Sequence, residues 1–183
     1  MTRADEQIVF THRPATEADI PAIRPLMDAA ISQLLKPYLP AEGVEASFDI
    51  MGLDTQLVAD GTYHVVEADG VVVGCGGWSR RATLFGGDHT AGRDAALLDP
   101  ASEPARVRAM YTHPAWTRRG VGRMILDICE GEAAGEGFVS CELAATLAGE
   151  PLYRACGYVE VERFSADTSS GVAVPLIRMR KAL

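Results

Sequence analysis

The stretch Met110–Arg123 requires a strand to end, a short turn to follow and a helix to begin within a few residues. Residues 106–112 predict the strand, and Pro114 ends it because proline lacks the N–H that pairing needs. From Gly120 to Ala134 the apolar side chains recur at helical spacing. The first N–H groups of such a helix have no intrahelical partner, and the helix dipole adds partial positive charge there. The stretch therefore predicts an anion-binding turn.

The residue types in this turn favour a diphosphate ligand. Gly120 and Gly122 lack side chains, so a pyrophosphate can approach the main chain beside Val121 closely. The turn also holds three arginines that can neutralise phosphate charge, namely Arg118, Arg119 and Arg123. The alternative interpretation is a tight turn with no ligand.

Two other phosphate-binding motifs are excluded. A Walker loop needs a lysine directly after its last glycine, and lysine occurs in this chain only at positions 36 and 181. A dinucleotide fingerprint needs spaced glycines that open a helix. The glycines of residues 74–77 continue instead into a strand that contains Trp78.

Charge is distributed unevenly along the chain. The net charge is −8, yet residues 106–123 carry five arginines and no acid. Such a cluster in an acidic protein indicates a site for a phosphorylated ligand, with a solvated charged face as the alternative. The acidic remainder argues against nucleic acid as a partner and weakly favours a small amine or polyamine acceptor over an acidic one.

Cysteine and histidine spacing predicts no metal site. The four cysteines form no C-x-x-C pair and the four histidines are scattered, so we expect no structural zinc. Reduced thiols indicate a cytoplasmic protein. The N-terminus lacks the apolar core of a signal peptide, and no apolar run is long enough to cross a membrane.

The remaining elements predict the order β-α-α-β-β-β-α-β-α-β-β in one domain over residues 1–183. This order indicates an α/β protein with a mixed sheet and helices on both faces. Asp69-Gly70 predicts a hairpin, and residues 41–59 predict a second helical segment. We expect Pro25 to bend or interrupt the first helix, and Pro175 to confine the start of the last strand to an edge or a bulge.

The sequence resembles the GNAT superfamily of N-acetyltransferases over essentially its whole length. The family signature is Q/R-x-x-G-x-G/A, and residues 117–122 match its glycines with Thr117 in place of Gln or Arg. Residues 151–158 match the family's Y-x-x-x-G-F/Y segment. The resemblance implies the acyl-CoA N-acyltransferase fold, a mostly antiparallel sheet whose fourth and fifth strands splay apart. It also implies that the turn grips the pyrophosphate of coenzyme A.

The resemblance implies further site residues. Backbone of Met110, Tyr111 and Thr112 would pair with the pantetheine arm, and Tyr153 would act as general acid toward the thiolate. The alternative for Tyr153 is a packing tyrosine. Many family members have an asparagine seven residues before that tyrosine, and Thr146 holds the position here.

We therefore expect an N-acetyltransferase that moves the acetyl group of acetyl-CoA to an amine of a small molecule or peptide. A backbone N–H on the fourth strand would polarise the thioester carbonyl. No general base is assigned, because the predicted strand at 106–112 contains no carboxylate. The residues weighed as bases are Glu142, Glu103, His64 and His113, and a water chain to solvent is the alternative.

The sequence suggests which residues line the pocket for the acceptor amine. Trp78, Tyr63 and the long polar loop 83–104 are expected to line it, with Trp78 in the core as an equal alternative. A homodimer remains open, and neither nucleic acid nor a membrane is expected as a partner. The competing function is a non-catalytic acyl-CoA-binding sensor or regulatory module.

Overall fold

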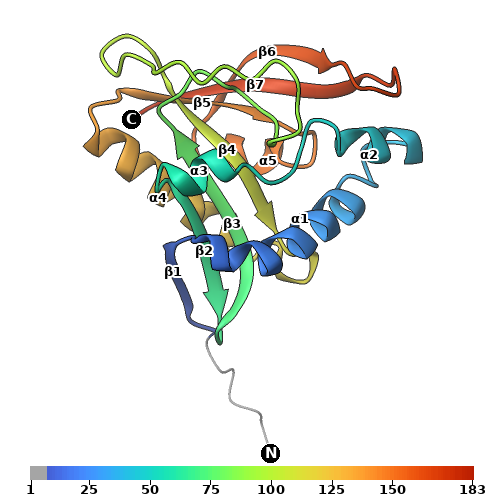
Figure 1. The fold of residues 1–183 in the computed structure, drawn as a ribbon, viewed down its shortest axis with the longest axis horizontal. Coiled ribbons are helices and arrows are strands. Elements are labelled where there is room, and N and C mark those ends of the chain that lie inside the picture. The colour runs from blue at the N-terminus through green and yellow to red at the C-terminus, as the bar shows by residue number, and fades with distance from the viewer. Residues whose placement is uncertain (1–7) are drawn as a thin grey trace, which may run out of the picture.

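The computed structural model describes residues 8–183 and is built on a seven-stranded sheet with the order β1-β2-β3-β4-β5-β7-β6 (Figure 1). The strands are β1 (Phe10–Pro14), β2 (Tyr63–Ala68), β3 (Val71–Ser79), β4 (Ala105–Thr112), β5 (Ser140–Ala145), β6 (Val159–Ala166) and β7 (Val174–Ala182). The helices are α1 (Ile20–Leu34), α2 (Ala41–Ser47), α3 (Thr55–Ala59), α4 (Val121–Gly135) and α5 (Glu150–Ala155), with short 3-10 turns η1 (Glu17–Asp19) and η2 (Pro114–Trp116). All neighbouring strands are antiparallel except β4 and β5. The predicted mixed, mostly antiparallel sheet is confirmed.

Helix α4 covers one face of the sheet. Its apolar side packs with residues of β2, β3, β5 and β7 in a single buried cluster. Two glycines of β3 make this contact close: a Cβ at Gly74 would lie 2.3 Å from Val121 Cγ1, and one at Gly76 would lie 2.7 Å from Ile125 Cγ2. The glycine run of β3 therefore serves helix packing.

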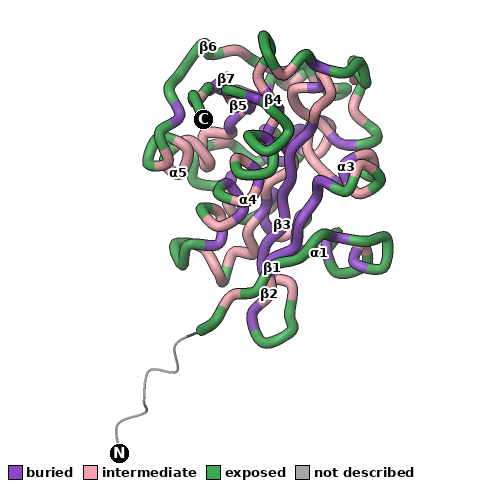
Figure 2. Tube along the Cα trace, turned by 90° about the vertical axis from the view of Figure 1, so that its left-hand side faces the viewer, coloured by how far each residue is buried: buried purple, intermediate pink, exposed green. Residues whose placement is uncertain are grey.

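Helix α1 covers the opposite face with a second buried cluster that includes residues of β2, β3 and β4. The helix continues through Pro25, contrary to the expected interruption. Pro25 lies near the beginning of α1, where its missing N–H removes one bond, to the carbonyl of Pro21. Burial of side chains such as Ile23 and Met27 on both sides of it outweighs that loss. Figure 2 shows the burial continuing along β2 and β3, whereas β6 at the sheet edge is largely exposed.

The predicted helical segment 41–59 is two helices. Gly52 has φ +136°, a conformation that ends any helix made of L-residues, and Asp54 restarts one by accepting a hydrogen bond from Gln56 N at 3.0 Å. The β2–β3 hairpin turns at Asp69 and Gly70, both with positive φ, as predicted.

The last strand, β7, lies between β5 and β6, but its beginning at residues 174–176 pairs with β6 alone, as expected from Pro175. Pro175 is tolerated there because β5 begins to pair only at Ile177 and Pro175 lies beyond it. Within residues 8–183, no helix is both long and apolar enough to span a membrane, and no group of three potential metal ligands occurs.

Candidate active site

A cavity of about 770 Å³ opens where β4 and β5 separate. The two strands pair only at Ala105–Cys141 and Arg106–Glu142 and then diverge. In the same region the register between β4 and β3 shifts, and Ala109 takes φ +50°. A bulge of this kind bends its strand and leaves backbone unpaired. The main chain of β4 from Val107 to Thr112 therefore faces the cavity without a partner from β5.

Two buried tyrosines support this part of β4. The Tyr63 hydroxyl donates to the carbonyl oxygen of Ala109 at 2.8 Å, and the Tyr111 hydroxyl accepts from Gly52 N at 2.8 Å. Burial raises the pKa of both phenols, so they remain neutral hydrogen-bonding groups. Tyr63 is fully buried and does not line the cavity, contrary to expectation. It instead holds the bulge from behind.

The turn after β4 presents the start of α4 to the cavity. Arg118 has φ +63° and Gly120 has φ +89°, so the chain reverses within three residues. Gly120 is the N-cap of α4 and supplies no side-chain cap, and a Cβ there would meet no atom within 4 Å. The first N–H groups of α4 therefore face open space with the positive end of the helix dipole.

Gly122 has a different role from Gly120. A Cβ at Gly122 would lie 2.6 Å from Leu152 Cδ2, so this glycine lets α5 pack against the first turn of α4. Gly122 is expected from the sequence to open space for a ligand, but in the structure its missing side chain makes room for Leu152. The contact places α5, which carries Tyr153, beside the anion-binding turn.

Most of the predicted cofactor-binding residues line the one cavity. These are Met110, Tyr111, Thr112, Arg118, Gly120, Val121, Gly122 and Arg123. Arg119 is not among the lining residues, and its guanidinium lies 4.9 Å from the centroid of the Trp116 ring.

The five-arginine cluster expected at a phosphate site is divided by the fold. Arg106 pairs with Glu142 at 2.6 Å and Arg108 pairs with Asp54 at 2.6 Å. Strand alternation and the bulge direct these two away from the helix start. Arg118 and Arg123 remain at the cavity, and no ion pair to either occurs within residues 8–183.

Tyr153 lies on α5 and lines the cavity, with its hydroxyl 3.8 Å from Met110 Sδ. Burial raises its pKa, so the phenol is protonated at neutral pH. Thr146 also lines the cavity, and its hydroxyl accepts a hydrogen bond from Gly149 N at 3.1 Å. This bond holds the turn that begins α5.

Glu142, the first candidate base, is held by arginines. Its carboxylate is 2% exposed and lies 2.6 Å from Arg106 Nη1 and 2.5 Å from Arg180 Nη2. It is not part of the cavity wall. These two ion pairs give the Glu142 carboxylate a structural role.

The other candidate bases also serve local structure. His64 is buried beside Glu132 at 3.0 Å, Glu103 accepts from Asp99 N at 2.7 Å, and His113 accepts from Ala115 N at 3.1 Å. Among the described residues that line the cavity, none is an aspartate, glutamate or histidine.

The far end of the cavity, away from α4, differs from the expected acceptor pocket. Trp78 is 1% exposed and donates to Glu132 at 2.8 Å, so it belongs to the core. Of the loop 83–104, residues 84–86 line the cavity. Sequence reasoning missed Asp54 and its partner Arg108. Asp54 lies in the predicted helical segment 41–59, and nothing in that pattern indicated its buried pairing.

The chain matches the model of the acetyltransferase (GNAT) domain over residues 59–160, more than half of its length. Among curated proteins, no sequence matches the chain.

Several solved structures share the fold. The GCN5-related N-acetyltransferase from Rhodopseudomonas palustris is 20% identical with a TM-score of 0.70, covering 94% of this chain and 95% of that one. The PaiA N-acetyltransferase from Thermoplasma acidophilum, in complex with coenzyme A, is 12% identical with a TM-score of 0.64, covering 96% and 99%. The ribosomal-protein-alanine N-acetyltransferase from Brucella melitensis is 20% identical with a TM-score of 0.64, covering 94% and 99%.

Proposed function

Since the chain belongs to the GNAT acetyltransferase family, we propose that it transfers the acetyl group of acetyl-CoA to an amine of a small molecule or peptide. The observation that carries the proposal is the continuity of the cavity. One space runs from the open N-terminus of α4, along the unpaired main chain of β4, to the hydroxyl of Tyr153.

The residues at the start of α4 suit the diphosphate of coenzyme A. Unpartnered N–H groups and the helix dipole attract phosphate oxygens, and Gly120 leaves the approach open. Arg118 and Arg123 add two positive charges. The free backbone of β4 from Met110 to Thr112 then offers hydrogen bonds to the amide groups of the pantetheine arm.

Acetyl-CoA supplies an activated acyl group, and three protein features act on it. A backbone N–H of β4 polarises the thioester carbonyl. The amine nitrogen bonds to the carbonyl carbon as the C–S bond breaks. The Tyr153 hydroxyl donates its proton to the departing sulfur, and its raised pKa keeps that proton available until then.

The amine loses its own proton to water in this proposal. No acid or histidine lines the described cavity wall, so water is the acceptor within reach. The proton returns through solvent to the Tyr153 phenolate, which closes the cycle with no net change in the protein. The rate is then expected to rise with pH as the free amine becomes neutral.

The experiment is release of free thiol from acetyl-CoA across a panel of amines and amino-terminal peptides, with the acetylated product identified by mass. We expect thiol release that depends on the added amine. Tight binding of acetyl-CoA without thiol release for any acceptor would favour the sensor function instead. Absence of acetyl-CoA binding would contradict both.

A further inference from the structure

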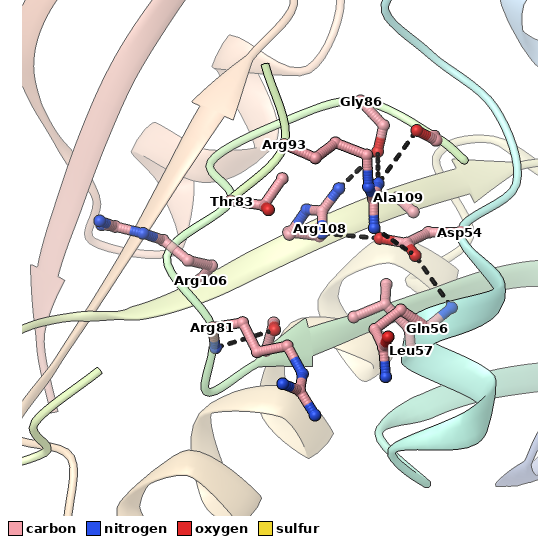
Figure 3. A network of polar contacts seen from close by, with 12 residues as sticks. Asp54, Gln56, Leu57, Arg81, Thr83, Gly86, Arg93, Arg106, Arg108 and Ala109 are labelled. Carbon is pink, nitrogen blue, oxygen red and sulfur yellow. Dashed lines mark hydrogen bonds and ion pairs between the residues drawn. The ribbon is translucent and has the colours of Figure 1, made fainter. Parts of the chain in front are cut away.

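At the acceptor end of the cavity, away from α4, one arginine stands in an otherwise mostly apolar wall. Arg108 lines the cavity beside Met51, Phe85 and Gly86, and its side chain is 2% exposed. A buried guanidinium carries a permanent charge and needs partners for its N–H groups. Figure 3 shows how those partners are arranged.

The partners of Arg108 leave an excess of positive charge. Asp54 pairs with Arg108 at 2.6 Å and with Arg93 at 2.9 Å, so one buried carboxylate faces two guanidinium groups. The carbonyl oxygen of Gly86 accepts from both arginines. Because no acid lines the described cavity wall, this excess of one charge is not balanced from the cavity side.

The Nε–H of Arg108 also has no partner among the described residues. Nη1 pairs with Asp54 and Nη2 donates to Gly86, whereas Nε is buried and has no hydrogen-bond partner within residues 8–183. An unsatisfied buried donor is costly, the more so when it is charged. A purely structural role accounts for the contacts of Nη1 and Nη2. It leaves Nε without a partner and the excess charge without a counterion.

Both features suit an anionic oxygen from the acceptor. A carboxylate against the Arg108 guanidinium would neutralise the excess charge in one charge-assisted contact. Arg108 lies two residues from Met110, whose sulfur contacts Tyr153, so neighbouring positions of β4 carry the guanidinium and contact the proposed acid.

We propose that the acceptor is an amino acid whose carboxylate is recognised by Arg108 and whose side chain is apolar. The apolar preference follows from the cavity wall, which includes Leu34, Leu35, Met51 and Phe85. This assignment of the acceptor class rests on the proposed acetyl transfer. It replaces the weak expectation of a polyamine, because the acidic residues of the N-terminal half do not reach the cavity wall.

The test compares the binding of three matched probes to the coenzyme A-saturated protein by calorimetry. The probes are L-phenylalanine, L-phenylalaninamide and phenethylamine, with the L-methionine series as a second set. We expect the acid to bind at least about tenfold more tightly than the amide or the decarboxylated amine, the size of one charge-assisted contact. Equal or weaker binding of both acids in the wild-type protein would overturn the proposal, whatever the variants do.

Arg108→Lys and Arg93→Lys form a matched pair, since both arginines pair with Asp54 and only Arg108 lines the cavity. We expect Arg108→Lys to remove most of the acid's advantage and Arg93→Lys to preserve it. Thermal unfolding and coenzyme A affinity verify that each variant is folded. An acid advantage that survives Arg108→Lys in folded protein would also overturn the assignment.

Thiol release separates the two proposals. Transfer to phenethylamine with no preference for the acid would leave acetyl transfer intact and refute the role of Arg108. Tight binding of the acid without thiol release would support carboxylate recognition by Arg108 and contradict acetyl transfer to this acceptor.

Discussion

At the scale of single residues, burial decides which groups can exchange protons. The phenol of Tyr153 is removed from water beside Met110, and its pKa is raised as a result. A raised pKa makes a phenol a weaker acid in the ground state but ensures that its proton is present when a thiolate forms. Tyr153 can therefore serve a leaving sulfur, whereas the paired carboxylate of Glu142 serves structure.

Tyr153→Phe is expected to lower turnover at least about tenfold, because the departing thiolate loses its proton donor. Coenzyme A affinity should stay nearly unchanged, since the substitution removes only the hydroxyl that is proposed to face the sulfur. Steady-state thiol release and calorimetry with coenzyme A measure the two effects. Unchanged turnover would remove Tyr153 from the mechanism.

At the scale of elements, the site depends on two local departures from regular structure. The bulge at Ala109 in β4 separates β4 from β5, and the reversal at Gly120 points α4 at the gap. The bulge places Ala109 at positive φ and the reversal places Arg118 and Gly120 there, a region in which a side chain is strained. Each is held by neighbours that a sequence pattern does not identify.

Tyr63→Phe tests the support of the bulge. The substitution leaves the buried carbonyl of Ala109 without its donor, and we expect a loss of about 1–3 kcal/mol in the free energy of unfolding. Because the bulge shapes the reacting end of the cavity, kcat/KM should fall about tenfold or more. Urea unfolding and thiol release measure both.

Ala109→Gly is the matched control for the bulge. Glycine adopts φ +50° without strain, so this variant should keep stability and activity. If Tyr63→Phe retains full stability and activity, the hydrogen bond is not what holds the bulge.

Gly120→Glu tests the start of α4 as the diphosphate site. The new side chain meets the strain of φ +89° and places a negative charge where the diphosphate is proposed to lie, so coenzyme A binding should be lost. Gly120→Ala introduces the strain without the charge and should weaken binding much less. Calorimetry measures the difference between the two.

Gly131→Glu is the charge control on the same helix. Gly131 is exposed and a Cβ there meets no atom within 4 Å. Its substitution should leave coenzyme A affinity unchanged. Retained binding in Gly120→Glu would place the diphosphate elsewhere.

At the scale of the whole molecule, buried thiols and phenols link stability to alkaline pH. Burial raises the pKa of Cys75 to about 12 and that of Cys141 to about 12. An unfolded cysteine ionises near pH 8.5. Above that pH the unfolded chain has fewer bound protons than the folded chain, so the free energy of unfolding falls as pH rises toward about 12.

Cys75→Ala should make this alkaline loss less steep by about 1.4 kcal/mol per pH unit between about pH 9 and 11, because one proton fewer is linked to folding. Lost packing at Cys75 lowers stability equally at every pH and does not affect the slope. Urea unfolding over this pH range is the measurement. Cys156→Ala, at a partly exposed thiol, should change the slope less, and an identical slope in wild type and Cys75→Ala would contradict the linkage.

Local patterns in the sequence determined the elements and the position of the anion-binding turn. Hairpin chemistry at Asp69-Gly70, helical spacing after Gly120 and the stop at Pro114 act within a few residues, so they can be recognised without the fold. Pro25 does not interrupt α1, and Pro175 lies where β7 pairs with β6 alone, because the cost of a proline depends on which bond is absent and on what packs around it.

Partnerships across the sheet were decided by the tertiary structure alone. Asp54 and Arg108 are far apart in sequence and meet because α3 and β4 are brought together. The same folding gives Arg106, Arg108 and Arg119 different partners and leaves Arg118 and Arg123 at the cavity. The cavity and its charge arise from these long-range contacts. The bulge and the burial of each strand determine which partner each side chain meets. Neither can be recognised from the local spacing of residues.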